Sequence, residues 1–381
     1  MYNKLFKYTN TYLELGEVSE IPRELISKFQ VEFLTVLDAE GNVDKTQMPH
    51  VSEDFVKKMY HLMVLTRTFD EKLFKLQRSG KIGTYAQIKG EEASEIGSGL
   101  ALEKDDWMVP SFRELGVFIA RDLDKVKLVQ AWNGDTRAFK GIEKTKNLPV
   151  AIPVCSQLLH AVGLAWAEKI KGTNNAVMVY FGDGATSEGD FHEALNFAGA
   201  HSLPIVFFCQ NNQWAISTPF EKQTGSKTVA QKAIAYGMEG LRVDGNDVLA
   251  TYKAADDALK KARKGDGPTL IESMTYRLGD HTTSDDSKKY RTDEEVAKWS
   301  KKDPLLRIQK YFEQIGTWNE EYKKWVKDEC VKEVKQAVDE ALAIEAPNPL
   351  NMFDTVYSEL TPDLEKQKKY LEAELERRGG K

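Results

Sequence analysis

The sequence predicts an α/β fold with a mostly parallel sheet that helices cover on both faces. The segments 177–181 and 205–209 are apolar throughout, as is usual for strands that are buried on both faces of a sheet, and TLIESMTY at 269–276 is a further strand-like segment. Helix-like segments separate these strands, and parallel strands need such crossovers. The chain has 381 residues, of which 41% are hydrophobic and 29% charged, so it can bury a sizeable core and lacks the composition of a disordered protein.

The predicted elements divide the chain into three parts. Residues 1–50 lack a sustained apolar period and are expected to form an N-terminal arm. The regular segments expected after it are a long amphipathic helix at about 52–80, strand 177–181, helix 188–200, strand 205–209, helix 247–264, strand 269–276 and helices after residue 304. A polar loop is expected at 279–292. The predicted organisation is therefore an arm (1–50), an α/β domain (51–345) and a helical C-terminal extension (346–381).

Charge and cysteine content argue against several classes of protein. The 53 basic and 59 acidic residues give a net charge of −6, which supplies no overall basic field for nucleic acid or anionic lipid. The three cysteines lie far apart without zinc-like spacing, so neither disulfides nor structural zinc are expected. The longest apolar stretches are much shorter than a membrane span, and the first residues contain no apolar signal core. We therefore expect a soluble, cytoplasmic protein.

The first candidate site follows strand 177–181. Gly182, Asp183, Gly184 and Ala185 stand at the carboxyl end of a parallel strand, where open α/β sheets place their ligands. The two glycines allow the backbone to approach a phosphate, and the Asp183 carboxylate can hold a metal ion. Because the third glycine comes late, the spacing does not fit the G-x-G-x-x-G dinucleotide fingerprint.

The second candidate site follows the neighbouring strand. Residues 210–214 have the sequence QNNQW, and Asn212 follows Asp183 by 29 residues. An amide oxygen and a backbone carbonyl are hard ligands that suit Mg²⁺, which completes its shell with phosphate oxygens and water. Each motif alone is common in turns and loops, whereas the two together at strand ends are much more specific.

This pair of motifs resembles that of the thiamin-diphosphate enzymes, in which N-N follows G-D-G after a similar interval. The closer resemblance is to the E1 α subunits of 2-oxo acid dehydrogenase complexes, and it covers almost the whole chain. The resemblance implies the thiamin-diphosphate-binding fold. It also implies that Asp183, Asn212 and the backbone carbonyl of Trp214 are the ligands of Mg²⁺.

Two further segments carry the resemblance. The sequence VPSFRE is similar to a segment whose arginine approaches the cofactor diphosphate, so Arg113 is implied in that role, and Phe112 stands where the family usually has tyrosine. The sequence AIPVCSQ resembles the segment that supports the bent cofactor through its backbone. The contacts implied here are those of Ile152 and Val154.

A third segment, RLGDHTTSDD, resembles the loop that carries the active-site histidine of the family, which implies that His281 is catalytic. Its polar loop has no core to fill, and imidazole can change its charge near neutral pH. Thr282 occupies a position that is a regulatory phosphorylation serine in the mitochondrial relatives, and whether it is modified stays open. The cofactor contacts implied by the resemblance are Phe112, Arg113, Ile152, Val154, Gly182, Asp183, Gly184, Ala185, Asn212 and His281.

The resemblance implies the activity of an E1 α subunit that binds Mg²⁺ and thiamin diphosphate. Such a chain works with a β subunit, decarboxylates a 2-oxo acid oxidatively and transfers the acyl group to a lipoyl group on the E2 acyltransferase core. In this family the glutamate that activates the cofactor belongs to the β subunit. An α2β2 heterotetramer is therefore implied.

The identity of the substrate stays open. Residues 210–224 resemble bacterial pyruvate enzymes, whereas residues 277–287 resemble branched-chain 2-oxo acid enzymes. Pyruvate is favoured, and acetoin dehydrogenase α is a third alternative. A non-catalytic module that binds Mg²⁺ and a phosphate ligand would use the same turn, but the G-x-x-x-x-G-K-[ST] motif of nucleotide-binding loops is missing around Gly182.

Overall fold

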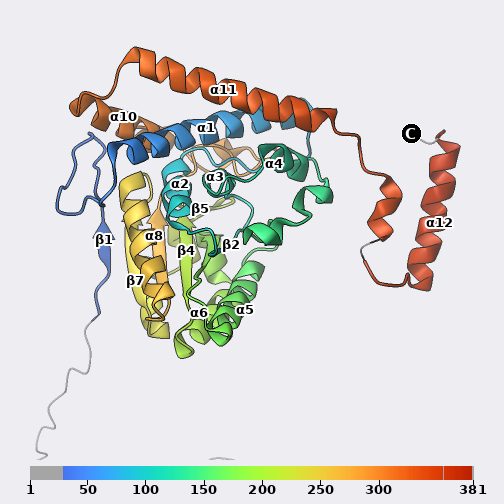
Figure 1. The fold of residues 1–381 in the computed structure, drawn as a ribbon, viewed down its shortest axis with the longest axis horizontal. Helices are drawn as coiled ribbons and strands as arrows, with labels where there is room; N and C mark the ends of the chain where they lie inside the picture. Colours follow the sequence, from blue (N-terminus) through green and yellow to red (C-terminus); the bar gives the residue numbers. More distant parts are fainter. Residues whose placement is uncertain (1–28, 355, 380–381) are drawn as a thin grey trace, which may run out of the picture. The chain divides into compact units, whose positions relative to one another are not determined.

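The computed structural model describes residues 29–354 and 356–379, so residues 1–28 of the predicted N-terminal arm lie outside the described residues. The chain divides into two compact units, Met1–Gln30 and Val31–Lys381. The second unit is built on a sheet of six parallel strands in the order β1-β7-β8-β4-β3-β2 (Figure 1). The strands are β1 (Glu32–Leu34), β2 (Trp107–Val109), β3 (Val177–Gly182), β4 (Ile205–Asn211), β7 (Glu239–Asp244) and β8 (Thr269–Met274).

Helices cover both faces of this sheet and bury two apolar cores. Successive side chains of β3 enter different cores, because Met178 and Tyr180 join one and Val179 and Phe181 join the other. The first core packs against α1 (Glu53–Arg78), α2 (Glu92–Ala101), α3 (Leu115–Ala120), α4 (Lys125–Trp132), α8 (Val248–Arg263), α10 (Pro304–Gln314) and α11 (Glu320–Ala343), and the second against α5 (Ser156–Lys171) and α6 (Gly189–Ala200). Burial of both faces explains why residues 177–181 of β3 and 205–209 of β4 are apolar at every position.

The predicted strands and helices are confirmed, with bounds that differ by at most two residues from those expected. Helix α1 begins where the sequence suggested, since the Ser52 side chain accepts a hydrogen bond from the N–H of Phe55. Strands β1, β2 and β7 were not predicted. Three residues in β1 and β2 are too few to show a two-residue period, and β7 (EGLRVD) is not an apolar run. Strand β1 comes from the predicted arm and pairs in parallel with β7.

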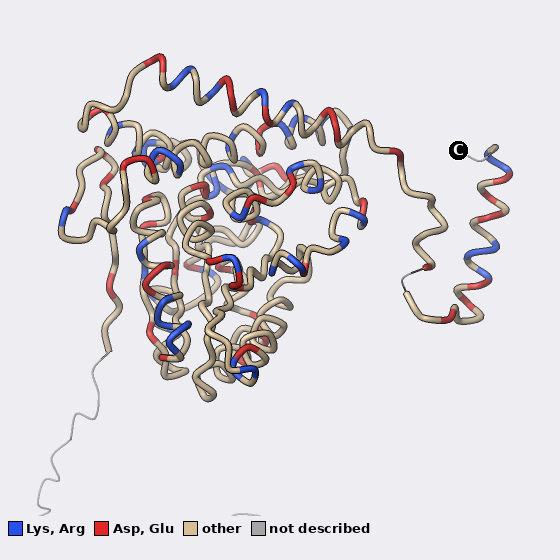
Figure 2. The backbone as a smooth tube through the Cα atoms, in the orientation of Figure 1, with Lys and Arg blue, Asp and Glu red and all other residues tan. Residues whose placement is uncertain are grey.

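The C-terminal segment is helical, as expected, and contains the short 3-10 helix η6 (Pro349–Phe353) and α12 (Pro362–Arg377). No residue of α12 is buried within the described part of the chain. Figure 2 shows acidic and basic residues interspersed along α11. Of the helices that the structure describes, none is long and apolar enough to cross a membrane. The division of the chain at residues 50 and 345 stays a prediction.

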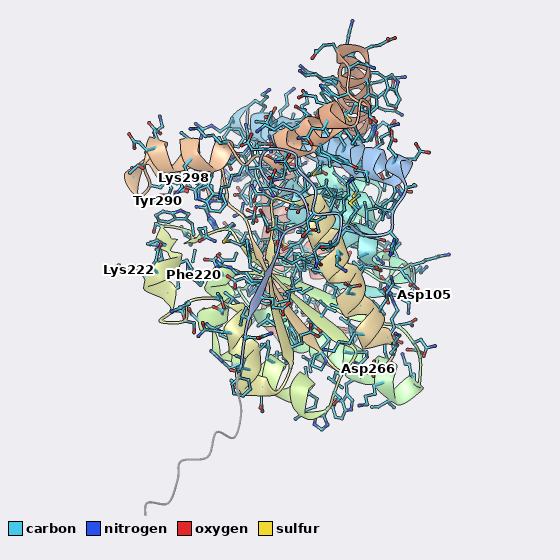
Figure 3. The ribbon with its side chains drawn as sticks, turned by 90° about the vertical axis from the view of Figure 1, so that its left-hand side faces the viewer. Asp105, Phe220, Lys222, Asp266, Tyr290 and Lys298 are labelled. Atoms are coloured by element: carbon cyan, nitrogen blue, oxygen red, sulfur yellow. The ribbon has the colours of Figure 1, made fainter. Side chains whose placement is uncertain are left out.

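Polar contacts order the loop at 279–292. The guanidinium of Arg291 donates hydrogen bonds to the carbonyl oxygens of three residues, Arg277, Leu278 and Gly279. Tyr290, labelled in Figure 3, donates from its hydroxyl to the carboxylate of Asp285. The loop is therefore held to the carboxyl-terminal end of the sheet without an apolar core of its own.

One buried carboxylate ties the first strand region to α8. Asp247 is 0% exposed and caps α8 by accepting hydrogen bonds from the N–H groups of Leu249 and Ala250, at 3.0 and 3.1 Å. Its other oxygen accepts from the N–H groups of Val36 and Leu37. We expect Asp247→Ala to lower the free energy of unfolding by about 3 kcal/mol, because four backbone donors lose their acceptor.

Thermal or urea unfolding of the purified protein measures this loss. Asp124→Ala is the matched control, because Asp124 caps α4 at an exposed position with a single hydrogen bond to Val126, and we expect it to cost about 1 kcal/mol. Equal losses in the two variants would contradict the role assigned to Asp247.

Candidate functional site

All the residues singled out in the sequence line one cavity of about 440 Å³. They come from five segments that lie far apart in the sequence. These residues are Phe112, Arg113, Ile152, Val154, Gly182, Asp183, Gly184, Ala185, Asn212, Trp214 and His281. The cavity lies at the carboxyl ends of β3 and β4, where open parallel sheets bind their ligands.

Asp183 and Asn212 meet because β3 and β4 are neighbours in register. The pairing runs to Gly182 opposite Gln210, so the two polar residues follow the last paired position by one and two residues. The Asp183 side chain is 1% exposed, and its carboxylate accepts a hydrogen bond of 2.6 Å from the Gln223 amide. Burial raises the pKa of Asp183 to about 6, against the lowering effect of this hydrogen bond.

A buried glutamate orients the Asn212 amide. The Nδ2 of Asn212 donates to Oε1 of Glu91 at 2.9 Å, so its Oδ1 is turned to the opposite side, where the N–H of Trp214 donates to it at 3.3 Å. Glu91 is 0% exposed, and burial raises its pKa to about 7. Glu91 was not predicted from the sequence, where it reads as one of several acidic residues at the start of α2.

The backbone between Asn212 and Ile216 is strained. Gln213 has φ of +75° and Ile216 has φ of +54°, and a β-branched residue rarely adopts the left-handed region. The conformation is held by Arg277, which donates to the carbonyl oxygen of Trp214 at 3.3 Å and to that of Ile216 at 2.9 Å. Residues 214–215 (β5, Trp214–Ala215) also pair with β6 (Thr218–Pro219), which closes this turn.

His281 is held between two guanidinium groups. Nδ1 of its ring lies 3.1 Å from Nη2 of Arg113 and 3.1 Å from Nη1 of Arg277. A guanidinium can only donate, so Nδ1 is the acceptor and the ring proton lies on Nε2. Burial, together with the positive charges of Arg113 and Arg277, lowers the pKa of His281 to about 3. The lowered pKa favours the neutral ring in this environment, whereas the sequence analysis expected an imidazole that changes its charge near neutral pH.

Arg113 and its neighbour Phe112 make further contacts around His281. Arg113 donates from Nη2 to the His281 carbonyl oxygen at 2.9 Å and from Nη1 to the carbonyl of Gln87. The Phe112 ring packs edge-on against the imidazole with 6.1 Å between the ring centroids. At the edge of the cavity Ile152 and Val154 are 60% and 54% exposed.

Several polar atoms of the cavity residues have no hydrogen-bond partner within the described part of the chain. They are Oε2 of Glu91, Oε1 of Gln157, Nε2 of Gln210 and Nε of Arg277. Buried polar atoms without partners are costly, so their grouping around one cavity suits a polar ligand. No group of three or more His, Cys, Asp or Glu side chains with metal-binding geometry occurs between residues 29 and 379 as described. A divalent ion here would depend on oxygen atoms of Asp183, Asn212 and Trp214 and on its ligand, which is the preference of Mg²⁺.

A family model for the dehydrogenase E1 component matches residues 60–350 of this chain. The chain belongs to this family. It is 41% identical over 369 residues to 3-methyl-2-oxobutanoate dehydrogenase subunit alpha of Mycobacterium tuberculosis, and the match spans 95% of this chain and 100% of that relative. Its identity to pyruvate dehydrogenase E1 component subunit alpha is 43% over 342 residues for Acholeplasma laidlawii (88% of this chain, 99% of the relative) and 39% over 343 residues for Staphylococcus aureus (90% and 92%). All three relatives are α subunits.

The two glycines of this E1 chain differ in what surrounds them. A Cβ on Gly184 would meet the Cβ of Ala215 at 2.8 Å, so close packing of the protein itself requires this glycine. The approach of a phosphate to this backbone, which the sequence suggested, stays a prediction. A Cβ on Gly182 would meet nothing within 4 Å and would enter the cavity. The backbone at Gly182, with φ of −86°, accepts any residue.

The two alanine variants should therefore separate stability from binding. We expect Gly184→Ala to lower the free energy of unfolding by about 1–3 kcal/mol through overpacking. Gly182→Ala should leave the unfolding midpoint unchanged and weaken binding of the ligand that fills the cavity. Unfolding curves and calorimetric titration with thiamin diphosphate and Mg²⁺ measure the two effects, and the same pattern in both variants would contradict this assignment.

Proposed function

We propose that this chain binds Mg²⁺ and thiamin diphosphate and, with a β subunit, carries out the oxidative decarboxylation of a 2-oxo acid and the reductive acylation of a lipoyl group on E2. The observation that carries the proposal is the meeting of Asp183 and Asn212 with Arg113 and His281 in one cavity at the strand ends. Membership of the dehydrogenase E1 component family supports the same activity.

The residues of the cavity suit the cofactor. Asp183, Asn212 and the carbonyl of Trp214 would hold Mg²⁺, which prefers such oxygen ligands together with phosphate. Arg113 brings a positive charge that suits the diphosphate, while its Nη1 and Nη2 donate to Gln87 and His281 in this structure. His281 offers a fixed N–H at Nε2. When bound, thiamin diphosphate supplies the electron sink for decarboxylation. The task of the chain's own residues is to fix the charged end of the cofactor and to exclude water around it.

The apolar surface beside the cavity supports the proposed β subunit. Ile152 and Val154 are more than half exposed at the cavity edge, and the adjoining helix α5 carries exposed Leu159, Trp166 and Ile170. Several large apolar side chains exposed along one helix favour a protein partner. We propose an α2β2 heterotetramer in which the β subunit completes the site and supplies the glutamate that activates the cofactor.

The favoured substrate is pyruvate, on the resemblance of residues 210–224 to the bacterial pyruvate enzymes. The alternatives are branched-chain 2-oxo acids and, less directly, acetoin. The identities of 43% and 39% to pyruvate dehydrogenase subunits and 41% to a 3-methyl-2-oxobutanoate dehydrogenase subunit do not separate these substrates.

The test is reconstitution of the α and β chains with cofactor. We expect the co-expressed pair to bind thiamin diphosphate in the presence of Mg²⁺ and to reduce an artificial electron acceptor with pyruvate or 3-methyl-2-oxobutanoate. The purified α chain alone is expected to show no turnover, because the activating glutamate is expected on the partner. Turnover by the α chain alone, or the absence of any cofactor binding by the pair in calorimetry, would overturn the proposal.

A further inference from the structure

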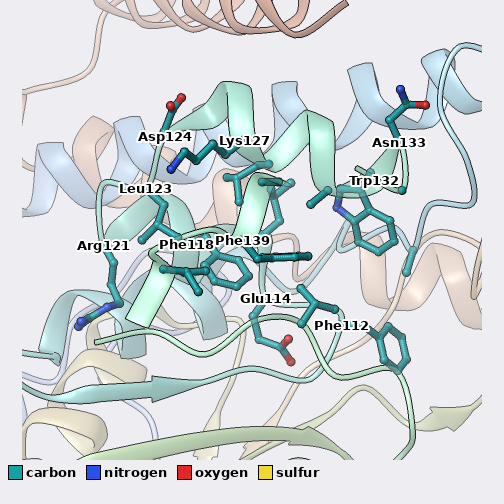
Figure 4. Close-up of a pocket in the computed structure, with 18 of the residues that line it drawn as sticks. Phe112, Glu114, Phe118, Arg121, Leu123, Asp124, Lys127, Trp132, Asn133 and Phe139 are labelled. Carbon is teal, nitrogen blue, oxygen red and sulfur yellow. The ribbon is translucent and has the colours of Figure 1, made fainter. Parts of the chain in front are cut away.

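A buried carboxylate lies in the sheet behind the strand ends that form the cofactor cavity. Glu272 is a charged residue within strand β8 and is 0% exposed. It lines neither the cofactor cavity nor the second cavity, of about 470 Å³, which shares Phe112 and Glu114 with the first (Figure 4). Burial of a charged group costs free energy unless hydrogen bonds and opposite charge compensate for it, so the contacts of Glu272 have to supply this compensation.

Both carboxylate oxygens of Glu272 accept a hydrogen bond. Oε1 accepts from Nδ2 of Asn211 on β4 at 2.7 Å, and Oε2 accepts from the backbone N–H of Ala230 at 3.1 Å. Arg242 lies opposite Glu272 in the register of β7 and β8, and its Nε is 3.4 Å from Oε1. A carboxylate can accept at both oxygens, whereas an amide in the same place would turn its NH₂ group towards one of the two donors.

The contact with Asn211 acts on the turn that follows β4. Because Glu272 holds Nδ2 of Asn211, Oδ1 faces the turn and accepts from the backbone N–H of Gln213 at 3.2 Å and from Nε2 of Gln213 at 3.1 Å. Gln213 has φ of +75°, a left-handed conformation that costs free energy and persists where the surroundings hold it. The residue that follows is Trp214, whose carbonyl oxygen is one of the ligands proposed for Mg²⁺.

The strained turn is therefore held from two sides. Arg277 donates to the carbonyl oxygens of Trp214 and Ile216, while Glu272 acts on the N–H side through Asn211. The position of a backbone carbonyl depends on the conformation of the chain around it and not on a side-chain rotamer. Residues that lie behind metal ligands and hold them in place commonly change metal affinity by about 10- to 100-fold when they are substituted.

On the basis of the proposed function, we propose that Glu272 is a positioning residue of the Mg²⁺ site. Through Asn211 it holds the left-handed turn at Gln213, and the turn sets the carbonyl oxygen of Trp214 in place for the metal. Loss of this carboxylate should loosen the turn in the absence of any cofactor and should weaken the binding of Mg²⁺.

Glu272→Gln in the reconstituted α and β pair tests the proposal. In either orientation of the new amide, its NH₂ group faces Nδ2 of Asn211 or the N–H of Ala230, so one of the two hydrogen bonds is lost. In calorimetry at fixed thiamin diphosphate, we expect the Mg²⁺ concentration for half-saturation to rise about tenfold or more. In the cofactor-free pair, we expect the amide hydrogens of residues 213–216 to exchange about tenfold faster, with exchange in β7 and β8 changed less than about twofold.

A double variant, Asn211→Asp with Glu272→Gln, provides the rescue. It exchanges the amide and the carboxylate, so the hydrogen bond between positions 211 and 272 can form again, the net charge is unchanged, and a carboxylate oxygen at position 211 can still accept from Gln213. We expect both measurements to return to within about threefold of the wild type. Glu239→Gln on β7 is the matched control, because that side chain is 57% exposed and pairs with Lys261 at the surface, and it should change neither measurement.

Asn211→Ala breaks the same link while Glu272 keeps Ala230 and Arg242. We expect it to show both defects, and it replaces Glu272→Gln in the test if that variant does not assemble with the β chain. A merely structural carboxylate would behave differently, since its loss would lower the unfolding midpoint and leave both the exchange at 213–216 and the Mg²⁺ half-saturation as in the wild type.

The outcomes separate this inference from the proposed function. Wild-type Mg²⁺ dependence together with wild-type exchange at 213–216 in Glu272→Gln would overturn the inference and leave the proposed function standing. Equal defects in Glu272→Gln and in the double variant would also overturn it, because the hydrogen bond to position 211 would then not be the cause. A wild-type pair that binds no thiamin diphosphate would instead reject the proposed function, while the exchange measurement on the cofactor-free pair would still show whether Glu272 holds the turn.

Discussion

Asp183→Asn is expected to weaken Mg²⁺-dependent binding of thiamin diphosphate by about 100-fold or more and to remove nearly all turnover of the α and β pair. The substitution keeps the volume of the side chain but removes the negative charge at the proposed metal position. We expect a large loss of affinity because Asp183 is only 1% exposed, so water cannot compensate for the lost negative charge. Calorimetric titration of the pair with thiamin diphosphate at fixed Mg²⁺ measures the effect.

The fold should survive this substitution, because the Gln223 amide that donates to Asp183 can also donate to the amide oxygen of an asparagine. Asp257→Asn on α8 is the matched control, since that carboxylate is 61% exposed and pairs only with Lys253 across one helical turn. Wild-type affinity in Asp183→Asn would remove the metal role from this residue.

His281→Ala is expected to lower the turnover of the pair by about 100-fold while the protein stays folded. The reason is the loss of the N–H at Nε2, which the hydrogen bonds from Arg113 and Arg277 to Nδ1 hold in one tautomer. Because the pKa of His281 is lowered to about 3, the ring keeps one protonation state across neutral pH. The ratio of wild-type to variant activity should therefore be constant between about pH 5.5 and 8.

His281→Gln retains an N–H donor and should therefore keep more activity than His281→Ala. The control His160→Ala, at an exposed position of α5, should keep the full wild-type activity. Steady-state rates over the pH range measure these effects. An activity ratio that changes near pH 6.5 would show that the imidazole titrates in the working enzyme, and full activity in His281→Ala would exclude any role for the ring.

The sequence was sufficient to predict the pairing of Asp183 with Asn212. Both residues follow apolar strands, and consecutive parallel strands with a helical crossover usually lie side by side, so their carboxyl ends meet. Local signals also predicted where α1 begins, because the capping hydrogen bond of Ser52 involves only the residues that follow it. The roles implied for Arg113 and His281 came from the family resemblance, and their proximity in the structure agrees with it.

Only the tertiary structure brought Glu91 and Arg277 to the site. Glu91 lies 121 residues before Asn212, and no spacing in the sequence indicates that its carboxyl accepts from the Asn212 amide. Such contacts depend on how the helices pack on the sheet, which local sequence does not encode.

The sequence by itself predicted the strands β3, β4 and β8 and the polar residues that follow β3 and β4, because apolar runs and turn residues act over a few positions. The tertiary structure decided the chemical state of those residues. It buried His281 between two guanidinium groups, and their charge together with desolvation, not the residue type, sets the pKa of the ring. It also set Gly184 against Ala215, where steric contact excludes a side chain. The burial and the local charge of a site depend on residues that lie far apart in the sequence, so they are known only from the folded chain.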